Sequence, residues 1–240
     1  MKKTKLALAI TAAACALLGA APAATAAPAA PPADFDVQPL IIGGGNASNA
    51  PWAARLFTNG RETCSASIIA PTYILTARHC VDGSGISFRV GSLDQHSGGT
   101  LVNAVQIYRH SSDLAIARID RSISTTYAPL GTTSHVAVGQ NVQIYGWGAT
   151  SRCGSEINCQ ARYLKVGTVR VTSTTASDAY GGLAIRATRV DAIAAGGDSG
   201  GPMFSNGRQV GVASTSDRVS VTNYTNVTRY RSWIQSIAGV

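Results

Sequence analysis

The chain has 240 residues, 45% hydrophobic and 13% charged, so it can bury a substantial core as one large β domain or two small ones. Its formal net charge is +8 at pH 7, but the arginines are scattered singly, with no basic run and no interleaved aromatic residues. This pattern favours a solvated, soluble surface over nucleic-acid binding.

The first 26 residues have the composition of a secretory signal. Three lysines within the first five residues precede an apolar run over residues 6–20, and the small residues Ala24-Thr25-Ala26 follow. We expect cleavage after Ala26 and a secreted, extracellular mature protein. The run is short for a membrane span, and no later segment is long enough, so no membrane association is expected. The Ala/Pro-rich residues 21–39 are expected to be extended and poorly ordered.

The cysteines indicate disulfide bonds. Cys15 lies inside the apolar run and leaves with the signal. The other four form an even set in an oxidising compartment. They allow three pairings, of which the spacing favours Cys64–Cys80 and Cys153–Cys159, each closing a short loop. A zinc site is the alternative, but no CxxC pair supports it.

From Ile41 onward the chain carries 17 basic and 10 acidic side chains, a net charge of +7. Short apolar or alternating segments alternate there with Gly, Ser, Asn and Asp clusters, which favours an all-β barrel or sandwich. A helical pattern appears only near the end, over Val227–Ile237. The predicted strands cover residues 65–69, 73–77, 86–90, 102–108, 114–119, 142–147, 164–171, 209–213 and 220–227.

Three segments carry residues suited to nucleophilic catalysis. Ser199 lies between two glycine pairs in AAGGDSGGPMF, a segment that also reads as a surface turn. His79 ends an apolar strand and precedes Cys80, so a disulfide would fix its position. Asp113 opens the apolar strand DLAIA, where a carboxylate could orient an imidazole or simply cap a turn. The other three histidines lack such a fixed position.

The motifs TARHC, DLAIA and GGDSGGP, in this order, resemble those of chymotrypsin-like (trypsin-fold) serine proteases. Further matching segments are IIGG at 41–44, GWG at 146–148, Ser214 after the strand VGVA, and YRSWI at 230–234. The resemblance implies two antiparallel six-stranded β-barrels, expected at 41–127 and 128–240, with a C-terminal helix. It also implies a monomeric endopeptidase that acts on protein or peptide substrates without a cofactor.

The resemblance assigns a role to each candidate. Ser199 would attack the scissile carbonyl, His79 would accept and return its proton, and Asp113 would orient His79. The backbone N–H groups of Gly197 and Ser199 would form the oxyanion hole.

The resemblance also implies activation by cleavage. Residues 27–40 would be a propeptide, and Ile41 would become the mature N-terminus. Its new ammonium would pair with Asp198 and hold the oxyanion hole open.

Specificity is predicted from the residues that match the family's substrate pocket. Ile193 would form the base and Ala194 would follow it, with Ser214 and Ser216 beside the bound substrate. Because no carboxylate is present there, we expect cleavage after apolar residues, in the manner of chymotrypsin or elastase. The bond before Ile41 follows a leucine, so such an enzyme could activate itself.

A glutamyl preference is the second candidate, because Ser216 and Arg218 could meet a carboxylate. However, Ala213 occupies the position where glutamyl-specific relatives carry a histidine.

The sequence departs from the family pattern at several positions. Arg78 replaces the small residue usual before the catalytic histidine, so its guanidinium should face solvent or pair with an acid. Ala195 replaces a disulfide cysteine beside the pocket, and Cys153–Cys159 is an additional bridge. No acidic cluster resembles a calcium loop, so no metal is expected.

Two other functions compete. A catalytically inactive binding module on the same fold is disfavoured because all the expected catalytic residues are present. A carboxyl esterase of the α/β-hydrolase type is disfavoured because the serine comes last and no strand–helix alternation appears.

Overall fold

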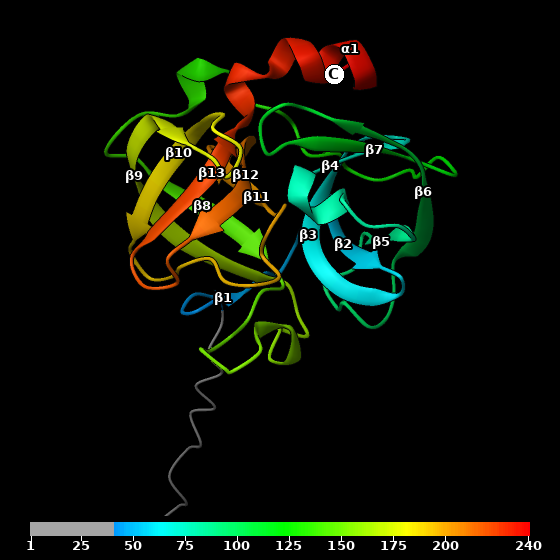
Figure 1. Ribbon diagram of the computed structural model, residues 1–240, viewed down its shortest axis with the longest axis horizontal. Coiled ribbons are helices and arrows are strands. Elements are labelled where there is room, and N and C mark those ends of the chain that lie inside the picture. Colours follow the sequence, from blue (N-terminus) through cyan, green and yellow to red (C-terminus); the bar gives the residue numbers. More distant parts are fainter. Residues whose placement is uncertain (1–40) are drawn as a thin grey trace, which may run out of the picture. The chain divides into compact units, whose positions relative to one another are not determined.

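The structure is a computed structural model that describes residues 41–240, so the predicted signal (1–26) and propeptide (27–40) lie outside the described residues. Almost all regular structure in this part of the chain is β-strand (Figure 1). None of its helices is both long and apolar enough to cross a membrane.

The first six-stranded barrel closes in the order β2-β3-β4-β7-β6-β5, with every neighbouring pair antiparallel. Its interior is filled by large apolar side chains that are completely buried, among them Leu56, Phe88 and Ile116. Burial alternates along β5, as expected for a strand with one face toward a core. The strands are β2 (Ala53–Thr58), β3 (Arg61–Ala70), β4 (Tyr73–Thr76), β5 (Ile86–Val90), β6 (Thr100–Arg109) and β7 (Ala115–Ile119).

The second barrel has the order β9-β10-β13-β12-β11-β8 and is closed by pairing of β8 with β9. These pairs are also antiparallel, so the predicted architecture of two six-stranded antiparallel barrels is confirmed. The strands are β8 (Asn141–Gly146), β9 (Lys165–Ser177), β10 (Leu183–Arg189), β11 (Pro202–Ser205), β12 (Arg208–Ser216) and β13 (Val221–Asn226).

Both ends of the described chain cross to the opposite barrel. The short strand β1 (Gly45–Asn46) pairs with β9 of the second barrel. Helix α1 (Arg231–Ala238) follows the second barrel, yet it contacts the first: the rings of Tyr230 and Trp233 lie 4.6 and 5.0 Å from that of His110. The 3-10 helices are η1 (Arg78–Val81), η2 (Thr133–His135), η3 (Glu156–Asn158) and η4 (Val227–Arg229).

The predicted elements differ from the structure in two respects. The terminal α-helix begins at Arg231 rather than at Val227, because residues 227–229 form η4; it ends at Ala238, and Gly239 takes the left-handed conformation of a helix C-cap. The sequence pattern also missed β1, β2, β10 and β11. Strand β2 carries the charged Arg55 among buried neighbours, which hides its apolar character.

Candidate active site

His79 and Asp113 meet at the edge of the first barrel. His79 lies in η1, directly after β4, and Asp113 lies in the turn before β7. The Nδ1 atom of His79 is 2.8 Å from Oδ2 of Asp113, and the backbone N–H of His79 donates to Oδ1 at 3.0 Å. The Asp113 side chain is completely buried. The carboxylate therefore fixes both the ring and the backbone of His79.

Ser214, in β12 of the second barrel, completes this hydrogen-bond chain by donating its hydroxyl to Oδ2 of Asp113 at 2.7 Å. Burial opposes ionisation of Asp113, but the hydrogen bonds from His79 and Ser214 outweigh it, so the pKa of Asp113 is lowered. Asp113 is thus an anion that is hydrogen-bonded to the ring and the backbone of His79.

The predicted disulfide pairing is present in the structure. Cys64 in β3 is joined to Cys80, the residue after His79, and Cys153 is joined to Cys159. The first bridge ties η1 to the barrel wall next to the imidazole.

Ser199 lies in the loop between β10 and β11, and its backbone is held from both barrels. Its carbonyl accepts from the N–H of Ser65 at 2.8 Å, and the N–H of the next residue, Gly200, donates to Ala213 at 2.9 Å. Gly200 has a positive φ of 79°, and an added Cβ there would lie 2.3 Å from the Ser65 carbonyl oxygen. A larger residue at this position is therefore excluded.

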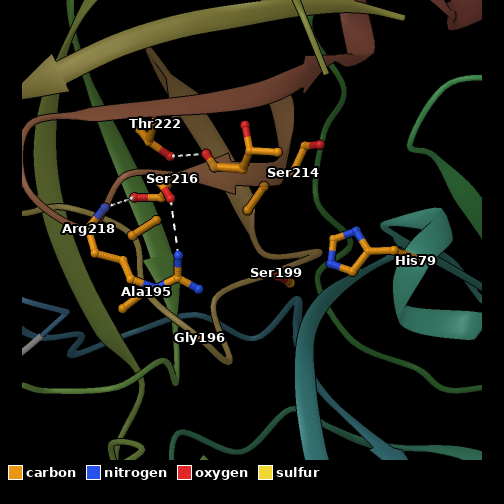
Figure 2. Close-up of a pocket in the computed structure, with 11 residues that line it drawn as sticks. His79, Ala195, Gly196, Ser199, Ser214, Ser216, Arg218 and Thr222 are labelled. Atoms are coloured by element: carbon orange, nitrogen blue, oxygen red, sulfur yellow. Dashed lines mark hydrogen bonds between the residues drawn. The ribbon is translucent and has the colours of Figure 1, made fainter. Parts of the chain in front are cut away.

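Ser199 and His79 line the same cavity of about 330 Å³. Figure 2 shows the imidazole turned toward Ser199, at one side of the group of residues that line this cavity. Within residues 41–240, no hydrogen bond joins the two side chains, so the structure brings them together without the contact that proton transfer needs.

Asp198 is a buried carboxylate beneath the loop, with 1% of its surface exposed. It accepts from the backbone N–H groups of Gly148 at 2.7 Å and Ala195 at 2.9 Å. Burial raises the pKa of Asp198 to about 6, against the opposing effect of these hydrogen bonds and of the positive charge of Arg55. An added Cβ at Gly148 would lie 2.2 Å from a carboxylate oxygen, so the GWG motif makes room for Asp198.

The raised pKa of Asp198 predicts a pH-dependent stability. The unfolded carboxyl ionises near its ordinary value of 3.8, whereas the folded one keeps its proton to about pH 6. The free energy of unfolding should therefore fall as the pH rises from about 4 to 6, by up to about 3 kcal/mol. Urea unfolding of the uncleaved chain, in which Ile41 offers no ammonium to Asp198, measures the effect across this range, and Asp198→Asn should abolish this part of it. An unchanged pH profile in the variant would contradict the assignment.

Ile41, the predicted partner of Asp198, is an internal residue of this chain, so its nitrogen is an amide. Its side chain is 1% exposed and lies in the apolar cluster of the second barrel, with Val142, Ile144 and Ala194. The structure thus buries Ile41 in the second barrel, without the ion pair expected of a free amine.

The cavity beside Ser199 is where the sequence placed the substrate pocket. Ala194, Ser214 and Ser216 line it, whereas Ile193, the predicted base of the pocket, is completely buried and is not among the lining residues. The sequence did not point to Thr222, which lines the cavity from β13. The lining residues are His79, Ala194, Ala195, Gly196, Ser199, Ala213, Ser214, Thr215, Ser216, Arg218 and Thr222.

A charged pair that the sequence pattern did not reveal lies beside the cavity. Nε of Arg218 is 2.6 Å from Oε1 of Glu156, and Nη1 of Arg218 donates to the carbonyl of Ser216 (Figure 2). The other oxygen of Glu156 accepts from the N–H of Gly196 at 2.8 Å. Glu156 belongs to the loop closed by the Cys153–Cys159 disulfide. This predicted disulfide was the only feature of the sequence that pointed to the loop.

Arg78, the residue before His79, contacts the loop that follows β6 and the ring of Tyr180. Its Nη1 donates to the carbonyl of His110 at 3.2 Å, and its guanidinium carbon lies 4.4 Å from the ring centroid of Tyr180. The half-buried side chain therefore makes a cation–π contact, and within residues 41–240 it forms no ion pair with an acid.

One group of three side chains in the described residues has metal-ligand spacing, namely Cys64, His79 and Cys80. Both cysteines are in the disulfide bond, so neither offers the thiolate that binds a metal.

The fold and the His79–Asp113–Ser214 chain beside Ser199 define the class of the molecule as a chymotrypsin-like serine protease. The sequence profile described as "Trypsin" matches residues 41–234. The chain belongs to the trypsin family, and it is a serine endopeptidase.

Curated relatives support this membership. Trypsin alpha of Drosophila melanogaster is 35% identical over 231 residues, covering 82% of this chain and 87% of the relative. Trypsin delta of the same species is 34% identical over 224 residues, covering 82% of this chain and 88% of the relative.

Solved structures agree on the fold. Human heparin binding protein has a TM-score of 0.71 at 21% identity, covering 82% of this chain and 96% of that one. The scabies mite inactivated protease paralogue S-D1 has a TM-score of 0.72 at 24% identity, covering 82% and 97%.

Proposed function

We propose that the protein is a secreted endopeptidase that works through an acyl-enzyme, with Ser199 as nucleophile, His79 as general base and Asp113 as its orienting anion. The observation that carries the proposal is the hydrogen-bond chain from Ser214 through Asp113 to His79, which ends in the cavity that Ser199 lines.

The chemistry follows from this arrangement. Because Nδ1 of His79 faces Asp113, its Nε2 is the nitrogen left to take the proton of Ser199. The oxygen of Ser199 then bonds to the carbonyl carbon of the substrate. The carbonyl oxygen becomes an anion, which lies between the N–H groups of Gly197 and Ser199. His79 returns the proton to the leaving amine as the C–N bond breaks, and water repeats the sequence on the ester.

A serine-reactive phosphonate tests the proposal. We expect one phosphonyl group per chain, on Ser199, with loss of peptidase activity at the same rate. The competing function is an inactive binding module, because the fold is shared by a protein described as an inactivated protease paralogue. A chain that binds peptides but is not phosphonylated would support that alternative and refute ours.

We further propose that the pocket prefers apolar side chains, even though the relatives named above are trypsins. Three alanines, Ala194, Ala195 and Ala213, line the cavity, and no carboxylate is among its lining residues. The nearby Glu156 is already paired with Arg218. A lysine or arginine of the substrate would therefore be buried without a counter-ion, at a cost of several kcal/mol.

Cleavage of a peptide library should show this preference. Substrates with Leu, Met or Phe before the scissile bond should have a higher kcat/KM than those with Arg or Lys, by at least about tenfold, since a buried apolar side chain gains roughly 1.5–3 kcal/mol. Faster cleavage after Arg or Lys would show that the pocket is trypsin-like. Ala194→Asp is the matched variant: a carboxylate on this wall should reverse the order.

The remaining parts of the proposal concern maturation. Residues 1–26 act as a signal, residues 27–40 as a propeptide, and the mature chain begins at Ile41 and forms barrels over 41–127 and 128–240. Burial of Ile41 in the second barrel supports a role for this residue inside the fold.

A further inference from the structure

Arg55 is a charged side chain in an unusual place. It lies in the middle of β2 and is completely buried, whereas arginine is rarely buried without an anionic partner. Within residues 41–240 it forms no ion pair, and its Nε has no hydrogen-bond partner. Its guanidinium carbon lies 5.9 Å from the ring centroid of Trp147, which belongs to the GWG motif of the second half of the chain.

The guanidinium reaches out of the first barrel to the loop of the second. Its Nη1 donates to the carbonyl of Gly197 at 3.1 Å, and its Nη2 donates to Oε1 of Gln160. Ser65, also in the first barrel, donates its hydroxyl to the same Gly197 carbonyl at 2.9 Å. Two buried donors therefore hold one carbonyl oxygen.

Gly197 is also the residue whose N–H was assigned to the oxyanion hole. It has a φ of +100°, in the region that favours glycine, and an added Cβ would lie 2.6 Å from Nε2 of Gln160. Such a residue has many accessible conformations, so its N–H has a fixed direction only if neighbouring groups impose one. Rotation of the Gly197 peptide groups would break the hydrogen bonds from Arg55 and Ser65 and leave Nη1 of the buried guanidinium without its acceptor.

The positive charge of Arg55 favours the same arrangement of the loop as its hydrogen bonds do. Burial lowers the pKa of Arg55 to about 10, so the group stays cationic at neutral pH, and Asp198 and Glu62 attract it. Asp198 directly follows Gly197. The positive charge of Arg55 therefore favours the position of the loop in which the Asp198 carboxylate is buried.

We propose that Arg55 is a positioning residue of the oxyanion hole, which holds the Gly197 carbonyl from the first barrel and thereby fixes the direction of the Gly197 N–H. This inference rests on the proposed catalytic function and adds a residue from β2 that does not touch the substrate.

The test compares three variants of the active enzyme: Arg55→Met, which keeps the length of the side chain but removes its donors, Arg55→Lys, which keeps a charge and one possible donor, and Ser65→Ala. We expect kcat to fall about 10- to 100-fold in Arg55→Met, since removal of a whole oxyanion donor costs about 10²–10³. KM should stay within about threefold, because the pocket walls are unchanged. Arg55→Lys should recover part of kcat, and Ser65→Ala should show a smaller loss of the same kind.

Leu56→Val is the matched control, because Leu56 is the next residue of β2 and points into the core of the first barrel instead of toward the loop. It should lower the melting temperature without lowering kcat. If Arg55→Met keeps the wild-type kcat, or if Leu56→Val loses kcat to the same extent, the proposal is wrong. If Arg55→Met does not fold, Ser65→Ala decides, and an unchanged kcat there overturns the proposal.

Phosphonate labelling distinguishes a failure of this inference from a failure of the proposed catalytic function. A wild-type chain that is not labelled at Ser199 overturns both. A labelled wild-type chain, with Arg55→Met labelled at the same rate, overturns only the role of Arg55.

Discussion

Replacing Ser199 by alanine should remove essentially all peptidase activity while the fold remains. The substitution deletes one hydroxyl that forms no hydrogen bond to His79 in the structure, so stability should change little. The nucleophile, however, is lost, which lowers kcat by roughly 10⁴-fold or more. The measurement is hydrolysis of a chromogenic peptide amide, with circular dichroism and melting temperature as checks of the fold.

Two further variants make this result specific. Ser236→Ala removes an exposed hydroxyl that bonds only to a carbonyl of α1, and it should retain full activity. His79→Ala combined with Ser199→Ala should be no worse than Ser199→Ala alone, because residues that act as a unit are not additive. Substantial turnover by purified Ser199→Ala protein would sink the assignment.

Replacing Asp198 by asparagine should leave a folded but weakly active enzyme. In the mature chain the Ile41 ammonium would be the partner of Asp198, and removing one member of a buried pair typically costs about 3–5 kcal/mol. If this free energy is lost from the active conformation of the loop that carries Ser199, peptidase activity drops by at least about 10²-fold. Asp120→Asn, at an exposed ion pair of the first barrel, is the control and should have little effect.

N-terminal sequencing of the active protein completes this test. We expect Ile41 as the first residue and little activity in the uncleaved chain. Full activity of a chain that begins at Ala27 would show that the ammonium is not needed.

The sequence predicted those features that depend on short segments. Cysteine spacing predicted the two disulfides, and alternating apolar residues located most of the strands. The order of three motifs placed His79, Asp113 and Ser199 in one site, because a family resemblance carries tertiary information that local patterns lack.

Features that depend on contacts between distant segments could not be predicted. Strand β2 was missed because Arg55 reads as a surface residue until its acceptor on Gly197 is known. The pair of Glu156 and Arg218 joins positions 62 residues apart, on two different loops. The sequence predicted that Ile193 faces the pocket. Whether Ile193 or the adjacent Ala194 does so depends on the direction of the backbone, which no local pattern encodes.

Both ends of the described chain contact the opposite barrel, although the two barrels are joined covalently at one place. Each disulfide lies within one half of the chain, so only the segment between β7 and β8 joins the barrels covalently. A cut there would leave His79 and Asp113 on one fragment and Ser199 on the other. Strand β1 would still pair with β9, and the rings of α1 would still cover His110. We expect the two fragments to be inactive alone and to carry complementary contacts, so that recovered peptidase activity would report their reassembly.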